Sequence, residues 1–305
     1  MRNTFAGYLL NEMDRKETYL LTGDLGFSAF EKIREKHHRY FMNMGISEQN
    51  MIGVAAGLLH SGKTVFVYSI IPFLVFRALE QIRNDVCYAN LPARIIGVGA
   101  GFSYSDAGPT HHSTEDVSVM SSLPNLTVLN PSDPIQVKML LEAANMVKGP
   151  IYMRLGKNGE PILHSEEYSL EIGKASKLSE GNEILIVSTG TILKNAISVS
   201  KMLEKNGLSC DLLEIHTPKP FDSEFVASSA TSKKLIVTIE ESTGWLFSSV
   251  AQALANIKHE RIVPFKLPDQ FVHISSQKKE WLWDYYGLSV SSIYKKIISE
   301  IDARI

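Results

Sequence analysis

The chain has 305 residues, which suggests two domains at roughly 150 residues per domain. Its composition, 44% hydrophobic and 21% charged, is that of an ordinary globular protein and excludes disordered and fibrous folds. Thirty-one basic side chains nearly balance 33 acidic ones, so the chain lacks the broad positive field with which proteins bind nucleic acid.

Two cysteines, Cys87 and Cys210, lie far apart in apolar stretches, which indicates buried free thiols rather than a disulfide. Free thiols are typical of a reducing compartment, so we expect a cytoplasmic protein. Charged residues interrupt the N-terminal stretch too early for a signal peptide. No apolar run approaches the roughly 20 residues of a membrane span.

Short apolar runs alternate with amphipathic stretches along the first half of the chain, which predicts a parallel sheet with helices on both faces. The clearest helical pattern runs from Phe73 to Cys87, where apolar residues recur at spacings of three and four and Arg77 falls on the polar side. The strands predicted in this half are Thr18–Leu21, Tyr40–Asn43, Thr64–Tyr68, Arg94–Val98, Leu126–Leu129 and Ile151–Arg154.

The pattern fades between Gly156 and Asn182, which we interpret as a crossover between domains. A second alternation of strands and helices follows, so the predicted fold is α/β with two open, mainly parallel sheets. We expect the first domain over residues 1–165 and the second over residues 172–305. The elements predicted in the second are strands Glu183–Ser188, Cys210–Ile215 and Leu235–Glu240, and helices Leu193–Lys205, Leu246–Asn256 and Ser291–Ile301.

Three segments rich in small and polar residues, 22–28, 45–50 and 99–115, follow predicted strands, where open α/β sheets bind their ligands. In the second segment, Ser47 can cap a helix whose first turn holds Glu48. The helix dipole stabilises a carboxylate there by roughly 0.3–1 kcal/mol, so a structural role accounts for Glu48. The same position also suits a carboxyl group that donates a proton to a ring nitrogen.

The third segment places two adjacent histidines, His111 and His112, among glycines and many hydroxyl side chains. This density of polar groups beside a strand end favours a binding or catalytic loop. In the alternative interpretation, Ser113 or Thr114 caps the next helix and the histidines are solvated. We expect no metal ligands, because adjacent histidines lack helical His-x-x-x-His spacing and no cysteine set accompanies them.

These segments carry a family resemblance. Gly45–Met51 is similar to the Gly-Ile-x-Glu-x-x-Met segment of transketolases, and Gly108–His111 resembles their Gly-Pro-Thr-His loop. Leu123–Asn125 and Asn130–Asp133 follow in the family's order and spacing. Over essentially its whole length, the chain resembles the pyrimidine-binding domain of transketolases followed by their C-terminal domain.

The resemblance implies a thiamine diphosphate-dependent enzyme. Glu48 would then hydrogen-bond N1′ of the cofactor's aminopyrimidine and promote loss of the thiazolium C2 proton. Phe73 and Phe76 match the aromatic wall on which the pyrimidine rests, although Phe76 also suits helix packing and Leu79 replaces a third aromatic residue. Asp24 matches an acidic residue near the cofactor.

The resemblance also implies a substrate site. His111 aligns with the histidine that contacts the substrate's reacting oxygen, and its near-neutral intrinsic pKa suits proton transfer. Arg154, Ser28 and Arg2 match residues that bind a substrate phosphate, for which guanidinium groups offer paired donors. Gly99 stands where the family has a second histidine, which leaves open a shortened or modified sugar substrate.

One part of the family site is missing from the chain. Gly23-Asp24 is followed by Leu25, so there is no Gly-Asp-Gly segment to hold the diphosphate and Mg²⁺. A buried diphosphate without a cation would be strongly destabilised. The resemblance therefore implies a split enzyme, in which an N-terminal transketolase-like subunit supplies that site and two copies of each chain form an α2β2 heterotetramer. We expect no catalytic residue in the second domain.

We expect this subunit to transfer a two-carbon ketol unit from a ketose, free or phosphorylated, to an aldose acceptor. One alternative is a subunit that acts on pyruvate, as in deoxyxylulose phosphate synthase or the beta subunit of a 2-oxoacid dehydrogenase. Gly108–His111 is not explained by the dehydrogenase alternative. A catalytically silent scaffold subunit is the other alternative, against which the retained Glu48, His111 and Arg154 argue.

Overall fold

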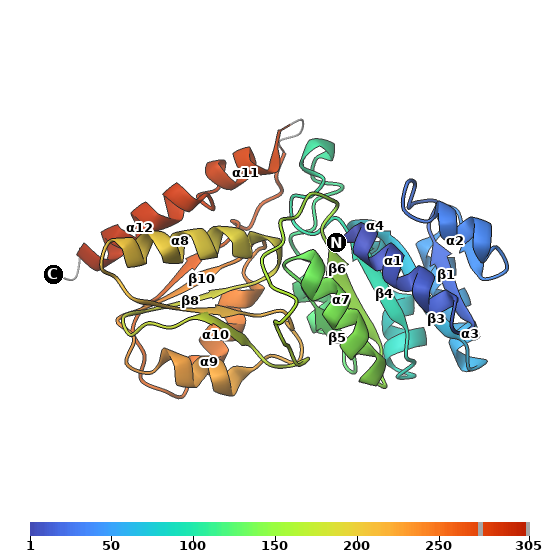
Figure 1. The fold of residues 1–305 in the computed structure, drawn as a ribbon, viewed down its shortest axis with the longest axis horizontal. Coiled ribbons are helices and arrows are strands. Elements are labelled where there is room, and N and C mark those ends of the chain that lie inside the picture. Colours follow the sequence, from blue (N-terminus) through green and yellow to red (C-terminus); the bar gives the residue numbers. More distant parts are fainter. Residues whose placement is uncertain (274–276, 303–305) are drawn as a thin grey trace.

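Two α/β domains lie side by side in the computed structural model, which describes residues 1–273 and 277–302 (Figure 1). Each domain is a sheet with helices on both faces, as the alternation of apolar runs and amphipathic stretches predicted. The described C-terminal helix lies at the end of the second domain that is remote from the first (Figure 1).

The first sheet is parallel throughout. Its strands are β1 (Thr18–Thr22), β2 (Phe41–Asn43), β3 (Thr64–Ile70), β4 (Arg94–Val98), β5 (Thr127–Leu129) and β6 (Ile151–Leu155), in the order β2-β1-β3-β4-β6-β5. The helices of this domain are α1 (Arg2–Met13), α2 (Glu31–Lys36), α3 (Glu48–His60), α4 (Ile71–Arg77), α5 (Leu79–Gln81), α6 (Asp116–Ser121) and α7 (Pro134–Ala143), with the π-helix η1 (Ile82–Cys87) and the 3₁₀ turns η2 (Ser105–Ala107) and η3 (Ala144–Met146). Helices α1 and α7 cover one face of the sheet, and α3, α4, η1 and α6 cover the other.

The second sheet is mixed. Its strands are β7 (Ser176–Ser179), β8 (Ile184–Ser188), β9 (Cys210–Glu214), β10 (Leu235–Ile239) and β11 (Ile262–Phe265), in the order β11-β10-β8-β9-β7, with only β7 antiparallel to its neighbour. The helices are α8 (Leu193–Lys205), α9 (Ser223–Ala230), α10 (Trp245–Leu254), α11 (Lys279–Tyr285) and α12 (Val290–Asp302), with the 3₁₀ turn η4 (Gly190–Ile192). Helices α8 and α12 pack on one face, and α9 and α10 on the other (Figure 1).

Every predicted strand is present within two residues of its expected bounds, and the predicted helix Leu193–Lys205 is α8. The helix predicted from Phe73 to Cys87 is instead broken into three pieces. Its first piece, α4, ends at Arg77, and the last is a π-helix in which the amide of Tyr88 bonds the carbonyl of Arg83. A change of helix type alters which side chains share a face, so the regular spacing does not continue to Cys87.

Both cysteines are buried and free, as predicted. One hydrophobic cluster contains residues from both domains, including Met51 of α3 and Val250 of α10. The two domains therefore share a core. Within the described residues, no helix is both long enough and apolar enough to cross a membrane.

Candidate active site

The three polar segments meet at one edge of the first sheet. Because β2, β1, β3 and β4 are parallel neighbours, their carboxyl ends lie together at that edge. Residues 22–28 follow β1, residues 44–47 follow β2, and residues 99–115 follow β4, while α4 begins directly after β3. The topology thus brings together segments that are far apart in the sequence.

Glu48 is the first residue of α3 and is only 2% exposed. Its Oε1 accepts a hydrogen bond from the Ser69 hydroxyl at 3.2 Å, and its Oε2 accepts one from Nη1 of Arg77 at 3.0 Å. Gly23 lies against this carboxylate, since a Cβ atom there would stand 3.3 Å from Oε1. The loop after β1 therefore closes over a buried carboxylate.

Ser47 occupies the N-cap position of α3, but the expected side-chain cap does not form. Its hydroxyl donates to the carbonyl of Met44 at 2.7 Å instead of accepting from the helix. Similarly, neither Ser113 nor Thr114 caps the following helix, because α6 begins at Asp116 without a side-chain cap. The alternative interpretation that these hydroxyls serve as caps is therefore wrong.

Arg77 connects Glu48 with Phe73. Its guanidinium carbon lies 4.2 Å from the centroid of the Phe73 ring, within the range of a cation–π contact, while the side chain is still 46% exposed. Phe76, expected beside Phe73 in an aromatic wall, is 44% exposed. The helical pattern alone places Arg77 on a solvated face, and its spacing of four residues from Phe73 is the only signal in the sequence for this contact.

His111 packs against the same aromatic ring. Its ring centroid is 5.0 Å from that of Phe73, in an edge-to-face arrangement, and 6.1 Å from that of Tyr104. Nδ1 shares a hydrogen bond with the Thr110 hydroxyl at 2.9 Å. Burial lowers the pKa of His111 below 6.5; the Asp106 carboxylate opposes this, and the charges of Arg77 and Lys157 reinforce it. The imidazole is therefore neutral at physiological pH and presents an unprotonated nitrogen.

Tyr104 fills the space beside Gly99. A Cβ atom on Gly99 would lie 2.5 Å from the Tyr104 ring, which is too close. The φ of Gly99 is also +100°, a backbone conformation that residues with a side chain rarely adopt. The Lys157 ammonium lies 4.5 Å from the centroid of the same ring. Lys157 is a candidate site residue that the sequence patterns do not reveal, although it comes three positions after Arg154 at the same sheet edge.

Arg154 is buried in β6 beneath the loop, with 4% of its surface exposed. Nε and Nη2 each donate to a carboxylate oxygen of Asp116 at 3.0 Å, and Nη2 also donates to the Ser113 carbonyl at 2.8 Å. The Tyr152 hydroxyl donates to the same carboxylate at 2.7 Å, and the remaining contact of Arg154 is Nη1 to Asn130 at 3.4 Å. The expectation of a phosphate ligand is not met by this geometry, because protein acceptors already engage both sides of the guanidinium.

Arg2 and Ser28, expected to bind phosphate, are brought together. Nη2 of Arg2 donates to the Ser28 hydroxyl at 3.4 Å. The positive charge of Arg2 also lowers the pKa of Tyr104, which burial raises more strongly, so Arg2 lies within electrostatic reach of the loop that carries His111. These groups border the site on the side of Tyr104.

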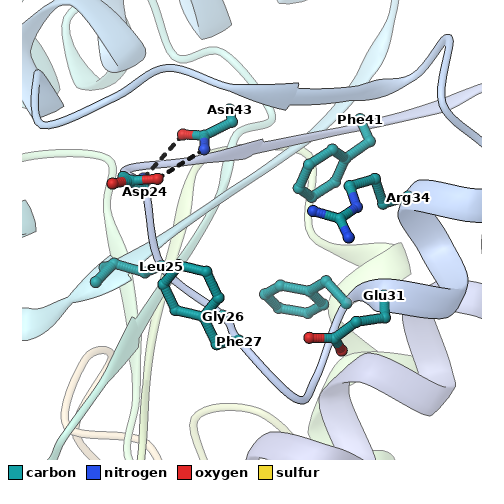
Figure 2. A pocket seen from close by; sticks show the side chains of 9 residues that line it. Asp24, Leu25, Gly26, Phe27, Glu31, Arg34, Phe41 and Asn43 are labelled. Carbon is teal, nitrogen blue, oxygen red and sulfur yellow. Dashed lines mark hydrogen bonds between the residues drawn. The ribbon is translucent and has the colours of Figure 1, made fainter.

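Asp24 has a left-handed backbone (φ +58°) and is held by Asn43. The side-chain NH₂ of Asn43 donates to the Asp24 carboxylate at 2.8 Å, and the side-chain carbonyl of Asn43 accepts from the backbone N–H of Asp24 at 3.0 Å (Figure 2). Asp24 also lines an open pocket of about 140 Å³, whose lining includes none of Glu48, Phe73 and His111. Around this pocket stand Leu25, Gly26, Phe27, Phe30, Glu31, Arg34, Phe41 and Asn43 (Figure 2).

Comparison with family models identifies both domains. Residues 1–160 match the model of the transketolase pyrimidine binding domain, and residues 173–293 match the model of the transketolase C-terminal domain. The matches cover most of the chain and fall on either side of the crossover.

Individual proteins show the same similarity. A Methanocaldococcus jannaschii protein named as a transketolase C-terminal section is 34% identical over 97% of this chain and 94% of its own length. One of the subunits of the apulose-4-phosphate transketolase of Phocaeicola vulgatus is 32% identical over 96% of this chain and 95% of its own length. A solved structure described as a split gene transketolase, inactive beta4 tetramer, superposes with a TM-score of 0.85 at 31% identity, covering 98% of this chain and 96% of that one.

Proposed function

The chain belongs to the transketolase family, in which it corresponds to the pyrimidine-binding and C-terminal domains, and from this premise we propose its role in catalysis. It is the subunit of a two-chain, thiamine diphosphate-dependent enzyme that transfers a two-carbon ketol unit from a ketose to an aldose. The cluster of Glu48, Arg77, Phe73 and His111 at the carboxyl edge of the first sheet is the observation that carries this proposal.

The cluster fits the cofactor's pyrimidine ring. The Arg77 guanidinium is a flat cation that lies over Phe73 and donates a hydrogen bond to Glu48. A planar heterocycle with a protonated ring nitrogen is likewise flat and offers the same kind of N–H donor. When bound, thiamine diphosphate supplies a nucleophilic thiazolium carbon and an electron sink for the transferred carbon unit.

Glu48 is proposed to exchange a proton with the pyrimidine nitrogen. Its carboxyl group is buried and fixed at the start of α3, so it can hold a proton at one defined atom. Phe73 provides the flat apolar surface against the ring and excludes water on that side, with Phe76 in the same helix at its margin. Asp24, fixed by Asn43, is proposed to lie at the edge of the cofactor site.

His111 is proposed to contact the reacting oxygen of the sugar. Because burial lowers its pKa, the neutral imidazole can accept a proton from a hydroxyl group and return it later. The Thr110 hydroxyl, bonded at Nδ1, holds the orientation of the ring.

A substrate anion would meet cations on the Tyr104 side of His111. We propose Arg2 with Ser28 and Lys157 for this task, because they lie near Tyr104 and retain exposure to solvent. Arg154 would act indirectly, since its bond to the Ser113 carbonyl holds the loop on which His111 stands. A sugar phosphate is the proposed substrate class, in line with the sugar phosphate in the name of the Phocaeicola vulgatus relative.

A partner is proposed to complete the site with the diphosphate and Mg²⁺ ligands. Large apolar side chains stand exposed on the loops beside Glu48, Phe27 at 75% and Ile46 at 78%. Such residues at the rim of a site are typical of a surface that another chain covers. The proposed partner is an N-terminal transketolase-like section, and the proposed assembly is α2β2 in the cytoplasm.

Mixing the chain with such a partner, thiamine diphosphate and Mg²⁺ tests the reaction. We expect a two-carbon unit to pass from a ketose phosphate to an aldose without release of carbon dioxide. Decarboxylation of pyruvate by the same mixture, with no transfer between sugars, would replace this proposal with the pyruvate-consuming alternative. A mixture that assembles and binds cofactor but turns over neither substrate would favour a scaffold subunit.

A further inference from the structure

The loop that carries His111 is anchored in the second domain. Phe102, at the start of this loop, is fully buried in the core formed by β8, α8 and α12, and its ring lies 6.2 Å from that of Tyr286. The amide of Thr243, which follows β10, donates to the carbonyl of Thr114 at the far end of the loop. Both ends of the loop therefore touch the second domain.

Glu241, also just after β10, is the centre of this anchor and is 6% exposed. Its Oε1 accepts hydrogen bonds from the backbone amide of Phe102 at 3.1 Å and from the indole of Trp283 at 2.6 Å. Its Oε2 accepts one from the Thr191 hydroxyl at 3.2 Å and pairs with the Lys279 ammonium at 3.1 Å. Both oxygens are thus fully engaged, and one partner is the loop backbone.

The loop backbone is shaped to receive this carboxylate. Gly101 has a φ of +58°, and a Cβ atom there would overlap the carboxylate of Glu241. Gly101 also exchanges two backbone hydrogen bonds with Ser113, at 3.1 and 3.0 Å, which close the base of the loop. His111 stands two residues from that closed base, so a shift at Gly101 is transmitted to it.

We propose that Glu241 is a positioning residue for His111, so that the second domain takes part in catalysis by fixing the geometry of the first. The catalytic part of this inference rests on the proposed role of His111. The claim that Glu241 fixes the position of His111 can be tested without catalysis. Without the carboxylate, the Phe102 amide loses its acceptor and the loop base loosens. The imidazole then becomes more hydrated at its place against Phe73.

The neighbouring Glu240 is a matched control. It is buried even more completely than Glu241, and burial raises its pKa, although bonds from Ser242 and the amides of Phe247 and Leu246 oppose this. Those bonds, to Leu246 at 3.0 Å and Phe247 at 2.9 Å, all stay within the second domain. Glu240→Gln therefore disturbs that domain without touching the loop.

The experiment follows His111 in the full chain by NMR, with its signal assigned from the spectrum of His111→Gln. In Glu241→Ala we expect the His111 pKa to rise toward 6.5, because hydration replaces burial. Glu241→Gln keeps an oxygen acceptor for the Phe102 amide, so it should shift less. Glu240→Gln should leave the titration unchanged even where it lowers the melting temperature.

With the partner present, Glu241→Ala should lower kcat roughly 10- to 100-fold and leave the affinity for thiamine diphosphate unchanged, because misplacement of a catalytic group by about 1 Å has effects of that size. An unchanged His111 titration in both Glu241 variants would overturn the inference. If Glu241→Ala does not fold, the His111 titration of Glu241→Gln alone tests the inference. If the His111 pKa shifts but the kcat of the active complex does not change, Glu241 does fix the position of the loop, and the proposed catalytic role of His111 is wrong instead.

Discussion

Two arginines of the first domain pair with buried carboxylates. The two guanidinium groups differ in how many protein acceptors they bond. Arg154 meets Asp116 through two parallel hydrogen bonds, and further acceptors surround it. Arg77 meets Glu48 through one nitrogen, and its other contact is the face of Phe73. One pair is sealed below the loop, whereas the other opens to solvent through Arg77.

The difference separates a structural pair from an exchangeable one. A buried, bidentate pair is costly to break, because loss of one partner leaves a charge without solvent. An arginine that is 46% exposed can leave and be hydrated, so a ligand with a better fit can take its place. Arg154 therefore holds the loop, and Arg77 marks the place of the proposed cofactor ring.

Glu48→Gln should have the largest effect on function. Loss of the acid should lower turnover of the reconstituted complex about 10²- to 10⁴-fold, because proton transfer through a positioned group contributes that much. The measurement is ketol transfer at saturating cofactor, with assembly checked by size. Glu80→Gln, on an exposed residue of α5, is the control. Normal turnover in Glu48→Gln would contradict the proposed proton exchange by Glu48.

Arg154→Met should produce the largest loss of stability. The Asp116 carboxylate would keep the Tyr152 hydroxyl but lose its countercharge, at a cost of about 3–5 kcal/mol. The free energy of unfolding in urea measures this change. A loss below about 1 kcal/mol, the range of an exposed pair, would show that the buried pair is not the anchor that the geometry indicates.

A third ion pair makes stability depend on pH. His164 lies 3.1 Å from Asp133 and 2.9 Å from Glu214, so it connects the two domains. Burial alone lowers its pKa, but the facing carboxylates outweigh burial and raise the pKa from 6.5 to about 9.

Since the folded pKa is the higher one, this stabilisation is complete below pH 6.5 and is lost as the pH rises through 9. The expected loss is about 3 kcal/mol between those limits. Unfolding curves across this range measure it, and His164→Gln should flatten the dependence. An unchanged slope in that variant would assign the pH effect to other groups.

Arg77→Met, the substitution matched to Arg154→Met, should have the smallest effect. We expect a loss of stability below the roughly 3–5 kcal/mol of Arg154→Met, because the Glu48 carboxylate keeps the Ser69 hydroxyl and water can replace the exposed guanidinium. Thiamine diphosphate should bind the complex as tightly as before or more tightly, since the face of Phe73 becomes free. Binding weakened by tenfold or more would mean that Arg77 is a ligand of the cofactor rather than its stand-in.

The sequence predicts most of the first sheet because its strands are buried on both faces and read as apolar runs. It misses β7 and β11 for physical reasons. Strand β7 is a short, half-exposed edge strand with two serines, and β11 contains Pro264 on the edge of its sheet. Tertiary pairing, rather than local pattern, forms these strands.

The candidate site is predicted in part. Glu48 and His111 are identified from the sequence because short motifs contain them, and the parallel topology brings them to one edge. Arg154 is expected to be accessible at a strand end, yet Asp116, 38 residues away, engages it. The contact of Glu241 with Phe102 spans 139 residues and leaves no local trace in the sequence. Burial and long-range pairing decide these roles.

The proposed function depends on a cofactor site that two chains share. Its most direct test is calorimetric titration of thiamine diphosphate with Mg²⁺ into this chain, into an N-terminal section with the Gly-Asp-Gly segment, and into their mixture. We predict tight, saturable binding and ketol transfer for the mixture, and neither for this chain alone. Binding and turnover by this chain alone at the level of the mixture would contradict a shared site.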